Sequence, residues 1–170
     1  MKYQRFEELP VWRAGIELAV KTYALTGEPC FKGHAGLRDQ IERAAVSVSN
    51  NVAEGFERGT TQELLTFLYI ARGSVGEVRS MLYLLERLPA FNDLKSEISN
   101  LKSLSESIAR QLRGWADSLQ NSEIKGQRYL TDKTRHAARE SRERAEFIDE
   151  IRRIQEENTA QSRTADEGDG

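Results

Sequence analysis

The segment from Leu37 to Gly55 carries two neighbouring stripes, one apolar and one polar, and the spacing predicts that both lie on one helix. At about 100° per residue, one side collects aliphatic residues: Leu37, Ile41, Ala44, Ala45, Val48 and Val52. The adjoining side collects a cation, a hydroxyl, amides and a carboxylate: Gln40, Arg43, Ser47, Asn50, Asn51 and Glu54. Polar groups beside a core lose free energy unless they have partners, so we expect this polar stripe to be enclosed by protein or to meet a ligand.

The segment before it predicts a helix that begins near Pro10, because proline suits the first helical turn, and ends at Gly27. Apolar residues recur there at steps of four, three and four, which predicts a buried face made by Trp12, Ile16, Ala19 and Tyr23.

The segment from Thr60 to Pro89 has the clearest helical signal. Thr60 and Glu63 form a capping-box pattern, and Pro89 ends the helix. Apolar residues follow strict four–three spacing, typical of bundle packing: Leu64, Leu68, Ala71, Val75, Val78, Leu82 and Leu85. Further apolar residues widen this arc and predict neighbours on more than one side: Phe67, Ile70, Met81, Leu84 and Leu88.

A fourth helix is predicted from a cap at Asn92 or Asp93, with the bundle spacing continued by Leu94, Ile98, Leu101, Leu104, Ile108, Leu112, Trp115 and Leu119. Short links make consecutive helices antiparallel neighbours. We therefore expect an all-α fold, an antiparallel up-and-down four-helix bundle over residues 1–120. A charged C-terminal helical extension follows it.

The extension differs in composition from the bundle. We expect a linker over residues 121–131, a charged amphipathic helix over 132–157 and a disordered tail over 158–170. Its apolar residues are few, and only Phe147 to Ile154 gives a short apolar face. A solvated helix fits this composition better than a second packed domain.

Net charge is informative once the chain is divided. Residues 1–119 hold 15 basic and 15 acidic residues, whereas residues 125–144 hold seven basic and three acidic ones. The neutral body is not typical of a dedicated nucleic-acid-binding protein. Cations that could contact the phosphates of RNA or DNA lie in the extension: Arg128, Lys133, Arg135, Arg139, Arg142 and Arg144. Glu140 and Glu143 interleave with them, as in a solvated helix with internal ion pairs, so partner binding is the preferred interpretation.

No catalytic constellation can be assembled from the residues, and we expect neither a cofactor nor a metal site. The histidines, His34 and His136, do not form the Glu-x-x-His pairs of di-iron bundles, and Cys30 is more typical of a small packed residue. A lone cysteine excludes an intrachain disulfide and favours a reducing compartment. No secretory signal and no long apolar run occur, so we expect a cytoplasmic protein with no membrane span.

The polar stripe extends to Ser74 and Glu77 on the next predicted helix, where Gly73 and Gly76 leave room for another helix. The preferred interpretation is a polar network between helices or between subunits, in which Arg43 pairs with a carboxylate. The alternative is that the stripe lines a pore or cleft of an oligomer.

Four blocks resemble one family: Phe6-x-x-Leu9-x-Val11-Trp12, Leu37-x-x-Gln40-Ile41-x-Arg43-Ala44-Ala45, Asn51-Val52-Ala53-Glu54-Gly55 and Ile70-Ala71-Arg72-Gly73-Ser74-x-x-Glu77. In this order they resemble the four-helix-bundle family of 23S rRNA intervening-sequence proteins over about residues 3–120. Members are similar to the accessory variability proteins of diversity-generating retroelements, which are homopentamers that bind a reverse transcriptase and its RNA. The resemblance implies a homo-oligomer, a pentamer, with no known catalytic activity.

These observations together favour a non-catalytic, oligomeric scaffold or adaptor. The alternative is a nucleic-acid-binding accessory subunit of a reverse transcriptase.

Overall fold

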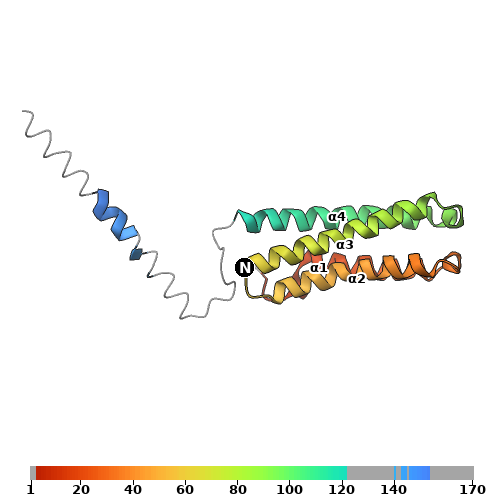
Figure 1. The fold of residues 1–170 in the computed structure, drawn as a ribbon, viewed down its shortest axis with the longest axis horizontal. Coiled ribbons are helices and arrows are strands. Elements are labelled where there is room, and N and C mark those ends of the chain that lie inside the picture. The colour runs from red at the N-terminus through yellow and green to blue at the C-terminus, as the bar shows by residue number, and fades with distance from the viewer. Residues whose placement is uncertain (1–2, 122–139, 141–142, 145, 154–170) are drawn as a thin grey trace, which may run out of the picture. The chain divides into compact units, whose positions relative to one another are not determined.

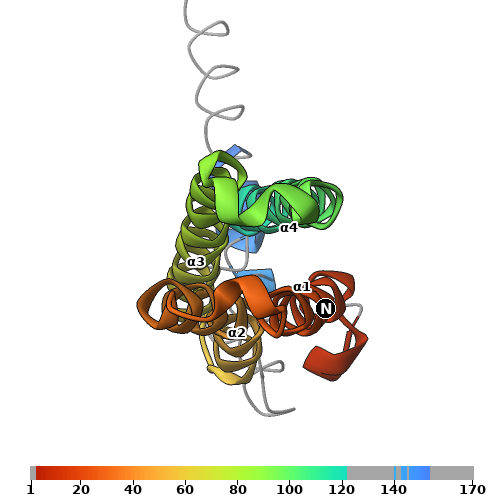
Figure 2. The ribbon, with the colours of Figure 1, turned by 90° about the vertical axis from the view of Figure 1, so that its right-hand side faces the viewer.

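The computed structural model describes residues 3–121, 140, 143–144 and 146–153, and the bundle occupies the first of these ranges. Its helices are α1 (Pro10–Thr26), α2 (Ala35–Glu57), α3 (Thr61–Arg87) and α4 (Lys95–Gln120). Short 3-10 turns precede or join them: η1 (Phe6–Glu8), η2 (Pro29–Phe31) and η3 (Pro89–Leu94). Each helix packs against the next, and α1 also packs against α4, which closes the bundle (Figures 1 and 2). The predicted all-α fold is confirmed for the described residues, and the contacts between the helices agree with the predicted antiparallel four-helix bundle.

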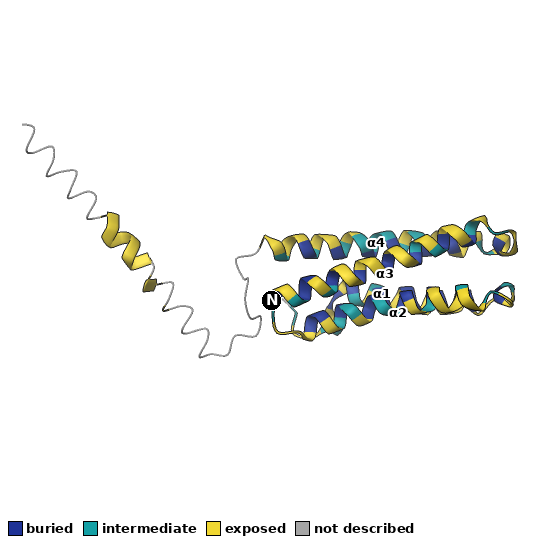
Figure 3. Cartoon of the chain, in the orientation of Figure 1, coloured by how far each residue is buried: buried dark blue, intermediate teal, exposed yellow. Residues whose placement is uncertain are grey.

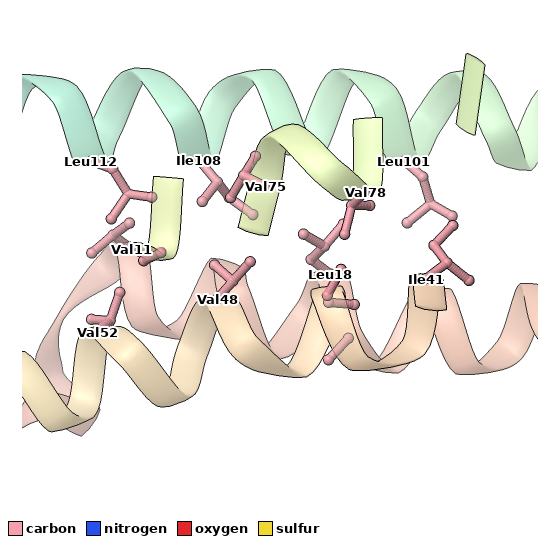
Figure 4. Close-up of a cluster of buried hydrophobic side chains, with 14 of the residues drawn as sticks. Val11, Leu18, Ile41, Val48, Val52, Val75, Val78, Leu101, Ile108 and Leu112 are labelled. Atoms are coloured by element: carbon pink, nitrogen blue, oxygen red, sulfur yellow. The ribbon is translucent and has the colours of Figure 1, made fainter. Parts of the chain in front are cut away.

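The core lies between the four helices, and each helix contributes to it (Figure 4). The seven heptad positions predicted on α3 are all buried, from Leu64 to Leu85. The predicted apolar stripe of α2 is buried too, apart from the half-buried Leu37. Buried residues thus form a continuous line along the inner side of the helices, while exposed residues cover the outer side (Figure 3).

The predicted buried face of α1 is wrong except at Ala19, which is buried. Ile16 and Tyr23 are exposed, and Trp12 is half-buried. The other buried residues of α1 lie beside the predicted positions: Val11, Gly15, Leu18, Thr22, Leu25 and Thr26. Gly15 is buried because α2 approaches it closely, and a Cβ atom there would lie 3.3 Å from the Cβ of Ser49.

The prediction that α3 has neighbours on more than one side is confirmed, because it packs against both α2 and α4. Of the residues that widen its apolar arc, Phe67, Met81 and Leu88 are half-buried, whereas Ile70 and Leu84 are exposed and differ from the prediction.

The connection between α3 and α4 begins where Pro89 predicts, but it is longer than expected. Residues 89–94 form η3, and α4 begins at Lys95, so neither Asn92 nor Asp93 caps it. Phe91 explains the extra turn. It is buried and its ring lies edge-on to Phe31, with 4.8 Å between the ring centroids, which anchors η3 to η2.

The start of α3 confirms the predicted cap. The Thr60 hydroxyl accepts a hydrogen bond from the Glu63 backbone N–H at 3.2 Å and donates one to the Glu63 carboxylate at 2.8 Å. Close packing holds the preceding turn: a Cβ atom on Gly55 would lie 2.6 Å from the Cβ of Phe67.

The described residues of the extension form a separate unit and are helical. They belong to the predicted helix over 132–157, and Phe147, Ile148 and Ile151 expose their side chains. The predicted linker beyond Asn121, both ends of that helix and the tail over 158–170 lie outside the described residues. Among the described helices, none combines the length and the hydrophobicity that crossing a bilayer requires.

Candidate functional site

A chain of hydrogen bonds crosses from α2 to α3 halfway along the bundle. The amide of Asn51 donates to the Ser47 hydroxyl at 2.9 Å, and the hydroxyls of Ser47 and Ser74 lie 2.9 Å apart. The Ser74 hydroxyl donates to the carbonyl oxygen of Ile70 at 3.2 Å. Each hydroxyl has one proton, so a consistent assignment has Ser47 donating to Ser74. Part of the predicted stripe is therefore a satisfied polar network between helices.

Beside this network, α2 and α3 form a shallow groove of about 500 Å³. Its lining brings together four of the predicted site residues and three others: Gln40, Arg43, Ser47 and Glu77 with Ala44, Ser80 and Met81. The groove is therefore made by the polar stripe of α2 and the facing side of α3.

The expectation that the whole stripe is enclosed is wrong for the single chain. Gln40, Arg43, Asn50, Glu54 and Glu77 are exposed, and only Ser47, Asn51 and Ser74 are covered by neighbouring atoms. The helical spacing places a residue on a side of α2, but the position of α3 decides how much of that side is covered.

The predicted pairing of Arg43 with a carboxylate is not formed among the described residues of the single chain, and a pairing between subunits stays a prediction. Within the described residues, neither Arg43 nor Glu77 makes an ion pair or a side-chain hydrogen bond, although both line the groove. Both charges remain available to a further molecule.

Glu54 has a local partner near the end of α2. Its carboxylate accepts a hydrogen bond from Arg58 at 2.6 Å, and both side chains are about half exposed. This bond raises the pKa of the Arg58 guanidinium, which also lies over the Phe67 ring, 5.2 Å from its centroid. Glu54 therefore holds Arg58 at the turn between α2 and α3.

Small and apolar residues surround the groove. Nothing lies within 4 Å of a Cβ atom built on Gly73 or Gly76, so α3 presents open backbone there. Exposed Ile70 and Leu84 stand one heptad from Glu77 on either side, on the same side of the helix.

A cluster that the sequence analysis missed lies on the other side of α3. Arg72 and Arg79 of α3 line a groove of about 260 Å³ with residues of α4, namely Glu106, Ala109, Arg110 and Arg113. The sequence does contain a signal for this cluster. Arg72 and Arg79 are seven residues apart and so lie on one side of α3, and Arg110 and Arg113 are three residues apart and so lie on one side of α4.

The described candidates for metal or thiol chemistry, Cys30 and His34, are not among the residues that line the two grooves. In the parts of the chain that the structure describes, no group of three or more His, Cys, Asp or Glu side chains could hold a metal ion. Cys30 is a half-buried free thiol beside the core, and the His34 ring tilts against Phe91 with 5.4 Å between centroids.

Among the candidate nucleic-acid contacts of the extension, Arg144 is described, and it is exposed on a helix. The other cations, Arg128, Lys133, Arg135, Arg139 and Arg142, lie outside the described residues.

Comparisons with known proteins concern the bundle. The family model of the 23S rRNA-intervening sequence protein matches residues 7–114. A 1.70 Å crystal structure of a protein with unknown function, from the S23 ribosomal protein family of Bacteroides thetaiotaomicron, is similar to this chain with a TM-score of 0.56. The two are 20% identical, and the match covers 62% of this chain and 97% of that one, so the likeness concerns the fold. No curated protein matches the chain.

Proposed function

This chain belongs to the family of 23S rRNA-intervening sequence proteins, and we propose that it is a non-catalytic subunit that assembles with copies of itself into a scaffold or adaptor. The observation that carries the proposal is the exposed apolar stripe of α1. Ile16, Val20 and Tyr23 are 39%, 64% and 49% exposed and follow one another at steps of four and three residues, so they lie on one side of the helix. Contiguous exposed apolar side chains mark interaction surfaces.

The α2–α3 face, defined here as the groove together with Ile70, Gly73, Gly76 and Leu84, is the surface that fits this stripe. Its glycines let the backbone of another helix approach, and Ile70 and Leu84 supply apolar contact on both sides. In the assembly, α1 of one copy lies on the α2–α3 face of the next.

Charged residues also support a contact between the α1 stripe and the α2–α3 face. Arg43 and Glu77 line the groove without partners in the described residues, whereas the α1 ion pair between Lys21 and Glu17, at 2.6 Å, flanks the stripe. In the assembly, the neighbouring copy supplies an opposite charge to Arg43 and to Glu77. A single chain supplies neither.

Two different surfaces that meet head to tail produce a ring when the rotation between copies closes. This arrangement agrees with the pentamer that the sequence resemblance implies. It also predicts which variants of the two surfaces can pair with each other.

A mixing experiment tests the arrangement. Val20→Lys removes the α1 surface, and Gly73→Gln obstructs the α2–α3 face. Both positions are exposed, so the fold remains intact. Each variant alone is expected to be monomeric in sedimentation velocity. A mixture of the two is expected to form a one-to-one pair, because one intact surface of each kind remains.

Ile148→Lys serves as the matched control, because it introduces the same charge at an exposed aliphatic residue outside the bundle. It is expected to assemble like the natural chain. Variants that stay monomeric on mixing would exclude head-to-tail contact between these two surfaces, and assembly of Val20→Lys alone would exclude the α1 stripe.

A further inference from the structure

The arginine groove, defined by Arg72, Arg79, Arg110 and Arg113 with Glu106, lies between α3 and α4. Arg72 and Arg79 are seven residues apart, so they lie about 10 Å apart along one side of α3. Glu106 and Arg113 have the same separation on α4. Because the helices are antiparallel, Arg79 lies level with Glu106, and Arg72 lies level with Arg113.

Carboxylates neutralise only part of this charge. Arg79 binds Glu106 at 3.0 Å, and Arg113 lies 3.6 Å from Asp117. Within the described residues, Arg72 and Arg110 make no ion pair or side-chain hydrogen bond. Cations held together in one groove repel one another, and an anion between them removes that cost.

Arg79 provides an independent sign of a missing acceptor. Its Nε atom is shielded from solvent and has no hydrogen-bond partner among the described residues, although its Nη2 atom binds Glu106. Buried donors without an acceptor are rare in folded proteins and call for an ion or another partner.

We infer that the arginine groove is a binding site for phosphate groups. Guanidinium groups bind phosphate through paired, charge-assisted N–H donors, which suits arginine better than lysine. Two phosphates of one ligand fit this groove, one at Arg72 and Arg113 and the other at Arg79 and Arg110.

Aromatic side chains flank the arginines along α3. Steps of three, four, three and four residues place one tyrosine beyond the arginines at each end of one side of the helix: Tyr69, Arg72, Gly76, Arg79 and Tyr83. Both tyrosines are exposed, and Gly76 leaves the middle of the line open.

Both tyrosines already have neighbours, and Arg87 lies 5.9 Å from the centroid of the Tyr83 ring. The Tyr69 hydroxyl accepts a hydrogen bond from Gln120 at 2.6 Å, and Lys102 lies 4.5 Å from the centroid of the Tyr83 ring. Phosphate contacts bracketed by exposed aromatic rings are typical of sites for single strands of nucleic acid, where bases stack on the rings. The phosphates can therefore come from a free oligophosphate or from a single strand, and the tyrosines distinguish the two.

Arg72 and Arg79 lie on the side of α3 that faces α4, and no arginine of the site is part of the α2–α3 face, although Gly76 borders both surfaces. The test uses the full chain with two probes, inorganic tripolyphosphate and a fluorescent oligouridylate. Arg72→Gln/Arg110→Gln removes the two unpaired cations and is expected to weaken probe binding about tenfold. For oligouridylate, the slope of log affinity against log salt is expected to fall by about 1.4, since each phosphate contact on a single strand contributes about 0.7.

Arg13→Gln/Arg38→Gln is the matched control, because it removes the same charge from exposed arginines of α1 and α2. It is expected to bind like the natural chain. Glu106→Gln makes the groove more positive and is expected to strengthen binding. Thermal melting of each variant confirms that it is folded.

Tyr69→Leu distinguishes the two possible sources of phosphate, a single strand of nucleic acid and a free oligophosphate. Weaker oligouridylate binding with unchanged tripolyphosphate binding supports a single strand as the ligand, whereas an effect on neither probe supports a free oligophosphate. The inference is overturned if the natural chain binds neither probe, or if the groove variant and the matched control bind equally well.

Discussion

The hydroxyl groups of Ser47 on α2 and Ser74 on α3 lie 2.9 Å apart, at the inner edge of a groove whose outer charges have no partners in the described residues. The contact divides the polar stripe into two parts. The inner part is satisfied within the chain and fixes how α2 meets α3. The outer part faces solvent and is the part that a second copy can engage.

Replacing Ser74 by alanine is expected to destabilise the bundle by about 1–2 kcal/mol, because the part-buried hydrogen bond to Ser47 is lost while only the hydroxyl group is removed. The free energy of unfolding in urea measures this effect. A double-mutant cycle with Ser47→Ala isolates the contact, and an interaction energy near zero would show that the two hydroxyls are not coupled.

Gly55→Ala is expected to destabilise the fold by about 1–3 kcal/mol, because the new Cβ atom would lie 2.6 Å from the Cβ of Phe67. Gly73→Ala is the matched control, since it meets nothing within 4 Å and exchanges glycine for a better helix former. It is expected to stabilise the single chain by about 0.5–1 kcal/mol. Thermal melting compares the two, and equal effects would contradict the close approach of α2 to α3.

Thr26→Val tests an ionic contact between α1 and α2. The Thr26 hydroxyl donates to the Glu42 carboxylate at 2.6 Å, and Arg38 donates to the same oxygen at 2.9 Å. Burial by itself raises the pKa of the Glu42 carboxyl, but these hydrogen bonds outweigh it and the pKa is lowered. Because the pKa is lower in the folded state, the ionised carboxylate stabilises the fold at pH values above its pKa in the unfolded chain, about 4.3. This contribution is lost as the pH falls through the folded-state pKa.

The valine variant is therefore expected to lose about 1–2 kcal/mol at neutral pH and less in acid, where Glu42 is protonated. Thr22→Val is the control, because the buried Thr22 hydroxyl donates to the Leu18 carbonyl oxygen and to no titrating group. Its cost is expected to be the same at each pH. Urea unfolding from pH 3 to 7 checks both, and parallel pH profiles would refute the ionic contact.

Arg43→Ala and Glu77→Ala are expected to change the unfolding free energy of a single chain by less than about 0.5 kcal/mol, because both side chains are exposed. Both are nevertheless expected to weaken assembly, since they remove charges from the α2–α3 face. Urea unfolding of dilute protein and sedimentation velocity of concentrated protein separate the two effects. A large loss of stability in dilute protein would show instead that these charges act within the chain.

The buried faces of α2, α3 and α4 could be predicted from the sequence because apolar residues recur on them at helical spacing, most regularly along α3. The face of α1 could not. Its core positions include Gly15, Thr22 and Thr26, which carry little hydrophobic signal, while exposed Ile16, Val20 and Tyr23 carry a strong one. An apolar stripe reserved for a partner looks the same in a sequence as a core stripe, and only the packed helices distinguish them.

The candidate site could likewise be predicted only in part. Helical spacing places Ser47 and Arg43 on one side of α2, but it does not show that α3 covers the first and leaves the second exposed. The arginine groove depends on which residues of α3 and α4 lie level with each other. That register is set by η3, where the buried Phe91 adds a turn that the loop sequence does not predict.

The native mass of the full chain tests the claim of self-assembly most directly. We predict that sedimentation equilibrium at micromolar concentration gives a multiple of the 19.3 kDa chain, five copies by the resemblance, and that Val20→Lys gives the mass of one chain. A single-chain mass for the natural protein under these conditions would contradict it.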